Sequence, residues 1–438
     1  MDILLVAYRF PPQTGGGIHR PHKFAKYLGR AGVNVTVVTI APDTEEPDAR
    51  PADLPDNVRI VRVAERGWMP ALRRMRTTGR SSLPSLLRLR SIVLAKWILV
   101  ETFVPDEHAE FVGAVASIAN IPEFRDVDAV ISTGGPWSGF VAGDELARRL
   151  RVPHVMDYRD PWTARPPAWP ALPGYRARRL NRKLERGLCR RAAFIISAHA
   201  AVAGMLEEQL ELPGLAARVH WIPNGYDPED FVGIEPRTSD RFSLTWAGSL
   251  YRGRSLEPIV RCLEDLGEAG EIDLERVELR VLGVHPERVR SQVQDARLLK
   301  NMIAPGEVTH DDALAFILGS TVNLLVDISY DGPIVHTPGK LYEYLASGRP
   351  VLSISTAGVT ADLIREAQAG WVVAPNDSAA LRDALRSAYG IWASGGAMPR
   401  AIPAVTEAYD RGKSTLRLKK LLEEMLRETP APRAKPQR

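Results

Sequence analysis

Two successive series of alternating β-rich runs and helical patterns limit the folds open to this chain more than any other feature of its sequence. In the first half, short runs rich in branched residues, such as 3–8 and 33–40, alternate with segments such as 18–30, whose apolar residues recur at helical spacing. The alternation restarts at 242–247. Strands that alternate with helices form βαβ units, so the pattern predicts an α/β fold with two Rossmann-like parallel-sheet domains.

The remaining predicted elements complete this alternation. Further strands are expected at 60–63, 129–133, 154–158, 194–198, 219–223, 277–282, 322–326, 351–354 and 371–374. Further helices are expected at 256–266, 311–318, 340–346, 379–389 and 415–426.

Residues 227–241 are polar and rich in Pro, Gly and Asp, which is typical of a connection between domains. The predicted organisation is an N-terminal domain (1–226) with a mostly helical basic insertion (66–112), a linker (227–241), a C-terminal domain (242–400), C-terminal helices that can cross back to the first domain (401–427) and a disordered tail (428–438).

Length and cysteine content bound the class of protein. A chain of 438 residues is too long for one ordinary hydrophobic core and fits two or three domains. Its two cysteines, Cys189 and Cys262, are too few for a disulfide framework and lack zinc-site spacing, which indicates a reducing compartment. No basic flank precedes the apolar run 3–7, and no stretch reaches the roughly 18 apolar residues of a spanning helix. We therefore expect a cytoplasmic protein that at most lies on a membrane.

Positive charge is concentrated in two blocks, although the formal net charge is only +4. Between 66 and 100, eight basic residues and no acidic one are mixed with tryptophan and aliphatic residues. That mixture favours an interfacial helix on anionic lipid, and the alternative is a solvated helical cover over the first sheet. A second block spans 176–191. Both blocks favour anionic partners, namely phospholipid, a lipid diphosphate or nucleic acid, but no nucleic-acid-binding motif accompanies them.

A glycine run follows the first predicted strand. Gly15, Gly16 and Gly17 stand between that strand and the helix at 18–30, where backbone amides and the helix amino terminus can approach an anion. The spacing is not Gly-x-Gly-x-x-Gly, which disfavours NAD or FAD. The alternative is a flexible loop that binds nothing.

A second candidate site lies in 338–351. A Pro-Gly turn opens a predicted helix, and Lys340 and Glu343 lie three residues apart on one face near its amino terminus, whereas Leu341 can pack on the sheet. A lysine there could meet a diphosphate, and a glutamate could accept hydrogen bonds from ribose hydroxyls. The alternative is an exposed Lys–Glu pair that contributes roughly a few tenths of a kcal/mol.

Five motifs, in this order, resemble those of the retaining GT-B glycosyltransferases of family four, which include the bacterial group 1 polysaccharide and lipopolysaccharide enzymes. They are Pro-Pro-x-x-Gly-Gly at 11–16, Asp-x-Arg-Asp-Pro-Trp at 157–162, Pro-Asn-Gly-x-Asp at 223–227, the strand and loop at 246–254, and the helix segment at 338–351. The resemblance covers nearly the whole chain. It implies a GT-B fold, in which two facing domains leave a cleft between the carboxyl ends of their sheets.

The resemblance also implies an activity and its residues. The expected reaction is transfer of a hexosyl residue from a nucleotide sugar to a lipid-linked or surface-glycan acceptor, with retention and without a metal or other cofactor. The implied catalytic residues are Arg254, Lys340 and Glu343. The implied donor-binding residues are Gly15, Gly16, Gly17, Gly248, Ser249, Arg252, Arg254, Pro338, Lys340, Leu341 and Glu343.

Three residues after the strand at 154–158 are expected on the acceptor side of the cleft. They are Arg159, Asp160 and Trp162. The alternative for Arg159 and Asp160 is an internal salt bridge that holds the loop.

Two departures from the family pattern keep other functions open. Members often carry a second glutamate eight residues before the one at Glu343, but that position is Val335 here, and His336 or a backbone amide is the candidate replacement. A histidine that members often carry after the fourth strand is replaced by the sequence 132–137. The rival hypotheses are a catalytically silent binding or scaffold protein and a GT-B sugar-nucleotide epimerase. Peripheral contact with the inner face of an anionic membrane is expected, and a nucleic acid partner is not.

Overall fold

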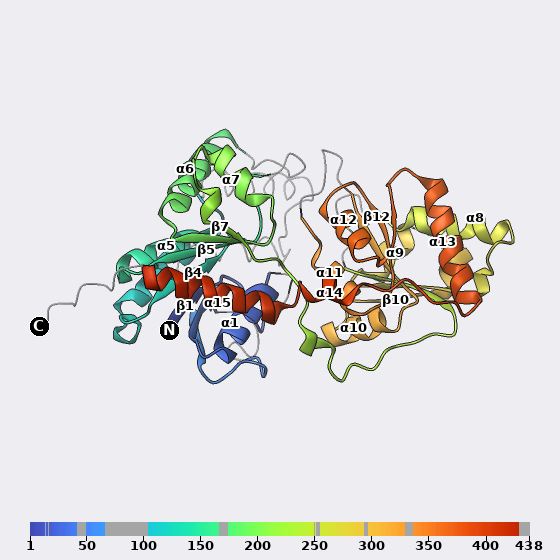
Figure 1. Cartoon of the computed structure of the whole chain (residues 1–438), viewed down its shortest axis with the longest axis horizontal. Coiled ribbons are helices and arrows are strands. Elements are labelled where there is room, and N and C mark those ends of the chain that lie inside the picture. The colour runs from blue at the N-terminus through green and yellow to red at the C-terminus, as the bar shows by residue number, and fades with distance from the viewer. Residues whose placement is uncertain are drawn as a thin grey trace, which may run out of the picture. The chain divides into compact units, whose positions relative to one another are not determined.

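A computed structural model describes residues 1–13, 15, 17–41, 50–65, 104–165, 174–248, 250, 255–292, 297–328 and 336–428. The chain divides into two compact units. One consists of Met1–Pro223 with Arg411–Arg438, and the other of Asn224–Asp410 (Figure 1).

The first unit is built on a parallel seven-stranded sheet in the order β3-β2-β1-β4-β5-β6-β7. Its strands are β1 (Asp2–Val6), β2 (Asn34–Ile40), β3 (Val58–Val63), β4 (Ala129–Thr133), β5 (His154–Tyr158), β6 (Phe194–Ser197) and β7 (Val219–Trp221). Its helices are α1 (His19–Arg30), α4 (Glu110–Ala116), α5 (Ser138–Leu150), α6 (Tyr175–Arg191), α7 (Val202–Leu210) and α15 (Arg411–Glu428).

Both faces of this sheet are buried, as its nearly continuous apolar strands require. On β1, Ile3 and Leu5 pack with the helices α1 and α15, while Leu4 and Val6 pack on the opposite face with α4 and α5. This alternation follows from the two-residue period of a strand.

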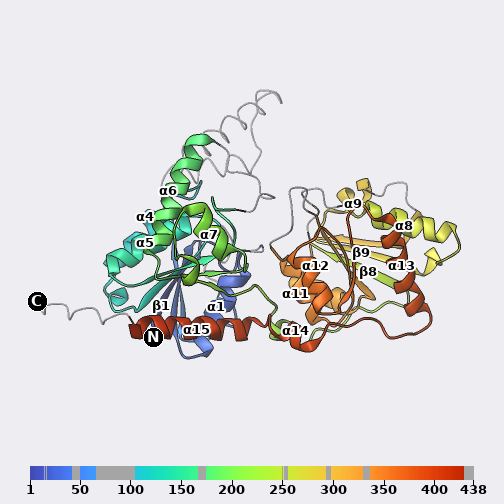
Figure 2. The ribbon, with the colours of Figure 1, turned by 45° about the horizontal axis from the view of Figure 1, so that its top comes forward.

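The last helix of the chain, α15, completes the first unit although it follows the whole of the second unit in sequence. It lies beside α1 (Figures 1 and 2). Its residues Leu418 and Leu422 are fully buried against Phe24 and Leu28 of α1. Without α15, this face of the sheet would expose its apolar side chains to water.

The second unit repeats the plan with six parallel strands in the order β10-β9-β8-β11-β12-β13. The strands are β8 (Phe242–Ala247), β9 (Val277–Leu282), β10 (Met302–Gly306), β11 (Val322–Asp327), β12 (Val351–Ser355) and β13 (Gly370–Val373). The helices are α8 (Glu257–Glu268), α9 (Pro286–Gln292), α10 (His310–Leu318), α11 (Gly339–Ala346), α12 (Val359–Glu366), α13 (Ser378–Ala393) and α14 (Pro403–Glu407). The helices α8 and α13 pack on one face, and α10, α11 and α12 on the other.

Each sheet reverses its strand order once. The chain passes from β1 to β2 and β3 and then returns to place β4 on the other side of β1, and it passes in the same way from β8 to β11. At such a point the loops after the two central strands run to opposite faces and leave room for a ligand at the carboxyl ends. The loops after β1, β4, β8 and β11 are therefore where ligand-binding residues are expected.

The predicted α/β class with two parallel sheets is confirmed, and all predicted strands exist within a residue or two of their expected bounds. The strand β10 was not predicted. It is a short edge strand whose pairing shifts register between Ile303 and Gly306, and Pro305 lacks the N–H that a regular ladder needs. The helices α5, α6, α7, α9 and α12 were not predicted either.

The segment predicted as a linker, 227–241, belongs to the second unit. The Asp227 carboxylate accepts a hydrogen bond from the Glu229 N–H, and the Arg237 N–H donates to the Ala315 carbonyl of α10 at 2.8 Å. The Arg237 guanidinium also lies 4.8 Å from the ring centre of Phe316. Polar composition predicted a connection here, but these contacts make the segment part of the second unit's packing.

Several predictions fall on residues outside the described ranges. These are the insertion over 66–103, the tail over 429–438, and Gly16, Ser249, Arg252 and Arg254. Among the helices of the described ranges, none combines the length and the apolar character that crossing a bilayer requires.

The position of α15 predicts unequal effects for two leucines of that helix. Replacing the fully buried Leu418 with alanine should lower the free energy of unfolding by about 2–4 kcal/mol, because it removes apolar contacts and leaves a cavity beside α1. The matched change at Leu416, whose side chain is 54% exposed, should cost less than about 0.5 kcal/mol. Urea unfolding of the two variants measures this difference, and equal costs would contradict the docking of α15.

Candidate functional site

The helix α11 begins directly after Pro338, whose backbone angles (φ −58°, ψ 134°) are extended. The proline carbonyl accepts a hydrogen bond from the Leu341 N–H at 3.0 Å. Leu341 and Leu345 are buried in the core on the α10–α12 face of the sheet. Because these residues occupy the inner side of the helix, Lys340 and Glu343 remain on its outer side.

A buried hydroxyl ties α11 to the carboxyl end of β8. The Tyr344 hydroxyl accepts a hydrogen bond from the Ala247 N–H at 3.0 Å, and Tyr344 is almost fully buried. Gly248 follows Ala247 in the chain, and Glu343 precedes Tyr344. The hydrogen bond between Ala247 and Tyr344 therefore joins the residues next to Gly248 and Glu343. The tertiary structure thus brings together two of the sequence-predicted site segments.

Glu343 is held by two cationic or donor groups at once. Lys340 Nζ lies 2.9 Å from its Oε2, and His310 Nε2 lies 3.1 Å from its Oε1. The carboxylate side chain is only 18% exposed. Burial by itself raises the pKa of this carboxyl, but the charge of Lys340 and the hydrogen bond and charge of His310 outweigh burial and lower the pKa to about 2. The carboxylate is therefore ionised at neutral pH and fixed in orientation.

His310 is the site residue that sequence reasoning missed. It is the first residue of α10, where the Thr309 hydroxyl caps the helix by accepting a hydrogen bond from the Asp312 N–H at 3.1 Å. The Thr-x-x-Asp pattern locates this helix start in the sequence. No local spacing connects His310 with Glu343, however, because 33 residues separate them.

Three neighbouring strands of the second sheet, β8, β9 and β10, end in or are followed by a glycine with positive φ. These are Gly248 (φ +140°), Gly283 (+80°) and Gly306 (+87°). The Gly248 N–H donates to the Leu282 carbonyl, and the Gly283 N–H to the Gly306 carbonyl. A Cβ at Gly248 would meet no atom of the described residues within 4 Å. Backbone without side chains at this edge lets a ligand approach closely.

His336, the candidate replacement for the missing glutamate, faces the end of β11. Its Nε2 lies 3.9 Å from Oδ1 of Asp327, which is almost fully buried. The Thr360 hydroxyl contacts both residues, at 2.8 Å from Asp327 Oδ2 and 3.1 Å from the His336 carbonyl oxygen. The environment of His336 is therefore a polar cluster at the second switch point, which the sequence did not indicate.

In the first unit, Arg159 connects three loops. Its Nε donates to Asp160 Oδ2 at 2.9 Å, its Nη1 to the Gly17 carbonyl at 2.9 Å and its Nη2 to the Gly135 carbonyl at 3.1 Å. The internal salt bridge considered from the sequence is therefore present. In addition, the planar guanidinium holds the glycine loop after β1 and the loop after β4 at fixed spacing from the loop after β5.

The glycines at 17 and 135 leave room for the Arg159 side chain. A Cβ at Gly17 would lie 3.0 Å from Arg159 Nη1, and one at Gly135, where φ is +81°, would lie 2.6 Å from Nη2. Gly15 also has a positive φ of +112°. The glycines at 15 and 17 thus serve the conformation and packing of the loop, in addition to any ligand contact.

Trp162 does not line an open surface as expected. Its side chain is fully buried in a cluster with Phe140, Tyr158 and Leu188, and its ring stacks on Trp137 at a centroid distance of 5.7 Å. The loop after β5 folds back on the sheet because an indole buries a large apolar area. Trp162 therefore supports the loop that carries Arg159 and Asp160.

A buried carboxylate from α6 holds the same loop. Glu185 accepts hydrogen bonds from the hydroxyls of Tyr158 and Thr163 and from the N–H groups of Thr163 and Ala164, the latter two at 3.0 and 3.3 Å. Burial raises the pKa of this carboxyl to about 6, although these hydrogen bonds oppose the shift.

A buried ion pair lies at the start of α1. Arg20, in the first turn of α1, donates through Nε to both oxygens of Asp157 at 2.8 and 3.0 Å, and through Nη1 to the Pro223 carbonyl at 3.1 Å. Both side chains are almost fully buried. These bonds join the start of α1 to the carboxyl end of β5 and to Pro223, the last residue of the segment Met1–Pro223.

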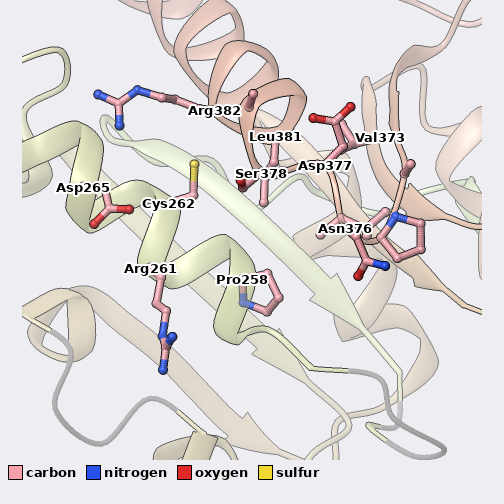
Figure 3. Close-up of a pocket in the computed structure, with 14 residues that line it drawn as sticks. Pro258, Arg261, Cys262, Asp265, Val373, Asn376, Asp377, Ser378, Leu381 and Arg382 are labelled. Carbon is pink, nitrogen blue, oxygen red and sulfur yellow. The ribbon is translucent and has the colours of Figure 1, made fainter.

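A pocket of about 410 Å³ lies elsewhere in the second unit, between α8 and the start of α13 (Figure 3). Arg261, Cys262 and Asp265 of α8 line one side and Arg382 of α13 the other. Both helices pack on the face of the sheet opposite to α11, so this pocket is not part of the Glu343 cluster. Among the described side chains, no group of three His, Cys, Asp or Glu residues could hold a metal ion.

Comparison with protein families gives matches over most of the chain. Residues 15–225 match the model of a glycosyl transferase 4-like domain, and residues 241–390 match the model of glycosyl transferases group 1. A search of curated proteins gives no match.

Solved structures share the fold of the whole chain at low sequence identity. Sucrose-phosphate synthase from Thermosynechococcus elongatus is similar with a TM-score of 0.66 and 15% identity, over 98% of this chain and 99% of that one. HepE from Anabaena, solved in complex with UDP-glucose, gives 0.61 and 15% over 97% and 100%. WaaG, a glycosyltransferase involved in lipopolysaccharide biosynthesis, gives 0.57 and 15% over 99% and 100%.

The Glu343 cluster predicts a pH-dependent contribution to stability. Because the pKa of this carboxyl is lowered from 4.5 to about 2, the ionised group stabilises the folded chain above about pH 4.5, and that stabilisation is lost as the pH falls toward 2. Glu343→Gln should therefore lower the free energy of unfolding by about 1–3 kcal/mol at pH 6 and by less than half as much near pH 3. Urea unfolding at both pH values measures this, with Glu366→Gln, an exposed position on α12, as the control. A cost that does not change with pH would contradict the assigned interaction.

Proposed function

The chain belongs to the group 1 glycosyltransferases, and on this basis we propose that it transfers a hexosyl residue from a nucleotide sugar to a lipid-linked or surface-glycan acceptor with retention at the anomeric carbon. The observation that carries the donor assignment is the carboxylate of Glu343, fixed by Lys340 and His310 beside glycine-ended strands. The structure of HepE with UDP-glucose supports a nucleotide-sugar donor for a protein of this fold.

In this proposal, Glu343 binds the ribose of the donor. A carboxylate has about four acceptor positions, so it can keep Lys340 and His310 and still accept hydrogen bonds from two vicinal hydroxyls. Since both oxygens are already oriented, binding requires little ordering of the side chain. Ionisation well below neutral pH keeps the acceptor capacity available.

Lys340 neutralises charge on the diphosphate. Its ammonium group has three donor hydrogens, of which Glu343 uses one, so it can also donate to a phosphate oxygen. The leaving nucleoside diphosphate gains negative charge as the glycosidic bond breaks, and fixed donors at that position lower the barrier. Arg252 and Arg254 are proposed to supply further positive charge, and Gly248 to offer its backbone, so no metal ion or other cofactor is required.

The acceptor is proposed to bind beside the loops that Arg159 holds together. Asp160 is partly exposed and shares one oxygen with Arg159, which leaves acceptor capacity for a sugar hydroxyl. Trp162 contributes by supporting this loop from below.

The protein is also proposed to contact the inner face of an anionic membrane peripherally, because a lipid-linked acceptor resides in that membrane. The acid-free basic stretch over 66–100 supports this contact. The assignment of WaaG to lipopolysaccharide biosynthesis supports an envelope glycan as the acceptor for a protein of the same fold.

The donor assignment predicts the effect of one substitution. After a panel of nucleotides has identified the preferred base by thermal stabilisation, Glu343→Ala should weaken binding of that nucleotide by about 1–3 kcal/mol, because a hydrogen bond to a charged group is lost. Calorimetry measures the affinity, and Glu366→Ala is the matched control. Unchanged affinity in a folded Glu343→Ala protein would refute the placement. Binding without transfer or hydrolysis would favour a silent protein, and epimerised donor would favour an epimerase.

The loop assignment predicts a separation of turnover from donor binding. Lysine at position 159 cannot make three fixed hydrogen bonds, so Arg159→Lys should let the glycine loops shift and lower turnover by about 10–100-fold. Nucleotide affinity should stay within about two-fold, because Lys340 and Glu343 are unchanged. Radiolabelled-donor assays and calorimetry measure both quantities, with Arg59→Lys, an exposed ion pair, as the control. Normal turnover of Arg159→Lys would contradict the proposal that Arg159 positions the loops for transfer.

A further inference from the structure

The helix α6 of the first unit is strongly and one-sidedly basic. Its 17 residues, Tyr175–Arg191, include eight arginines and lysines, and its one acidic residue, Glu185, is buried. The buried side of this helix anchors the loop after β5 through Glu185. Its outer side has no part in the proposed site.

Four of the basic residues form a single stripe on that outer side. The buried residues Ala177, Asn181, Glu185 and Leu188 define the inner face. At 100° per residue, Arg176, Arg179, Lys183 and Arg190 fall within roughly 60° of one another and directly opposite this inner face. All four are exposed. The stripe is about 21 Å long, given a rise of about 1.5 Å per residue.

The stripe is not balanced by carboxylates. None of its four residues forms an ion pair with another residue of the described ranges, whereas the flanking Arg182 and Arg191 pair with Glu211 and Asp144. Several exposed arginines elsewhere in the described ranges are paired with carboxylates. Examples are Arg148 and Arg149 with Glu145, Arg261 with Glu257, and Arg365 with Asp362. Concentrated positive charge without internal partners attracts an external polyanion.

Two exposed apolar side chains border the stripe at the amino-terminal half of α6. Tyr175 is 75% exposed and Leu180 is 39% exposed. A tyrosine places its ring at the level of lipid headgroups, and a leucine can enter the acyl boundary.

We propose that the stripe of Arg176, Arg179, Lys183 and Arg190 docks the first unit on an anionic phospholipid bilayer, with Tyr175 and Leu180 at the headgroup level. A straight row of cations beside apolar side chains matches a flat anionic surface. The proposal extends the membrane contact proposed above to a surface outside 66–100. It does not require the assigned reaction, since it concerns only where the first unit binds.

The test compares two full-length variants with the same loss of charge. One carries Arg176→Gln, Arg179→Gln, Lys183→Gln and Arg190→Gln. The control carries Arg148→Gln, Arg149→Gln, Arg261→Gln and Arg365→Gln, all exposed and paired in the wild type. Binding to vesicles of phosphatidylcholine with phosphatidylglycerol, and to vesicles of phosphatidylcholine alone, is measured by sedimentation.

The wild type should bind the anionic vesicles, and salt should weaken that binding. Each basic residue close to such a surface contributes a factor of about five in partitioning, so the loss of four should make the stripe variant bind on the order of several hundred-fold more weakly, and the control should stay near the wild type. Nucleotide affinity in the absence of vesicles should be unchanged in both variants, which separates this test from that of the donor site.

Three results would overturn the proposal: no binding of the wild type to anionic vesicles, undiminished binding of the stripe variant, or an equal loss in the control. The second result would leave the contact to 66–100, and the third would show a dependence on net charge alone. Thermal melting of both variants establishes that they fold, and the inner face of α6 is untouched in both.

Discussion

Burial of both faces of a parallel sheet is the constraint on which each unit depends. Parallel strands joined by helices place all their carboxyl ends at one edge, so the loops that follow them meet there. The apolar alternation of β1, with Ile3 and Leu5 on one face and Leu4 and Val6 on the other, requires helices on both sides. In the first unit that requirement is met in part by α15, which the chain supplies only after the second unit is complete.

In the first unit, buried polar contacts hold the loops that follow the carboxyl ends of the strands. Arg159 donates to the carbonyls of Gly17 and Gly135, and Glu185 accepts from the backbone of the loop that carries Arg159. Charges removed from water are costly unless they are paired or hydrogen-bonded. Arg159 pairs with Asp160, and Glu185 accepts hydrogen bonds from Tyr158, Thr163 and Ala164. Fixed loops are what a group-transfer site needs, because small displacements of reacting atoms reduce the rate strongly.

The electrostatics of the two units differ in kind. In the second unit, positive groups are used internally, since Lys340 and His310 share one buried carboxylate and keep it ionised. On α6 of the first unit, four cations face solvent with no described carboxylate near enough to pair. The first arrangement suits precise recognition of a small ligand, and the second suits non-specific attraction to an extended surface.

Hydrophobic periodicity in the sequence determined the class of fold and the strands, because this pattern is local and follows from the periods of strands and helices. The segments at 15–17, 159–162 and 338–343 were predicted as site candidates from their places beside those strands and helices and from their resemblance to family motifs. Only the tertiary structure decided which of these residues meet. His310 contacts Glu343 across 33 residues, Trp162 turns inward although its neighbours lie at the edge, and α15 returns to the first sheet. Contacts between distant segments arise from packing, which no spacing along the chain encodes.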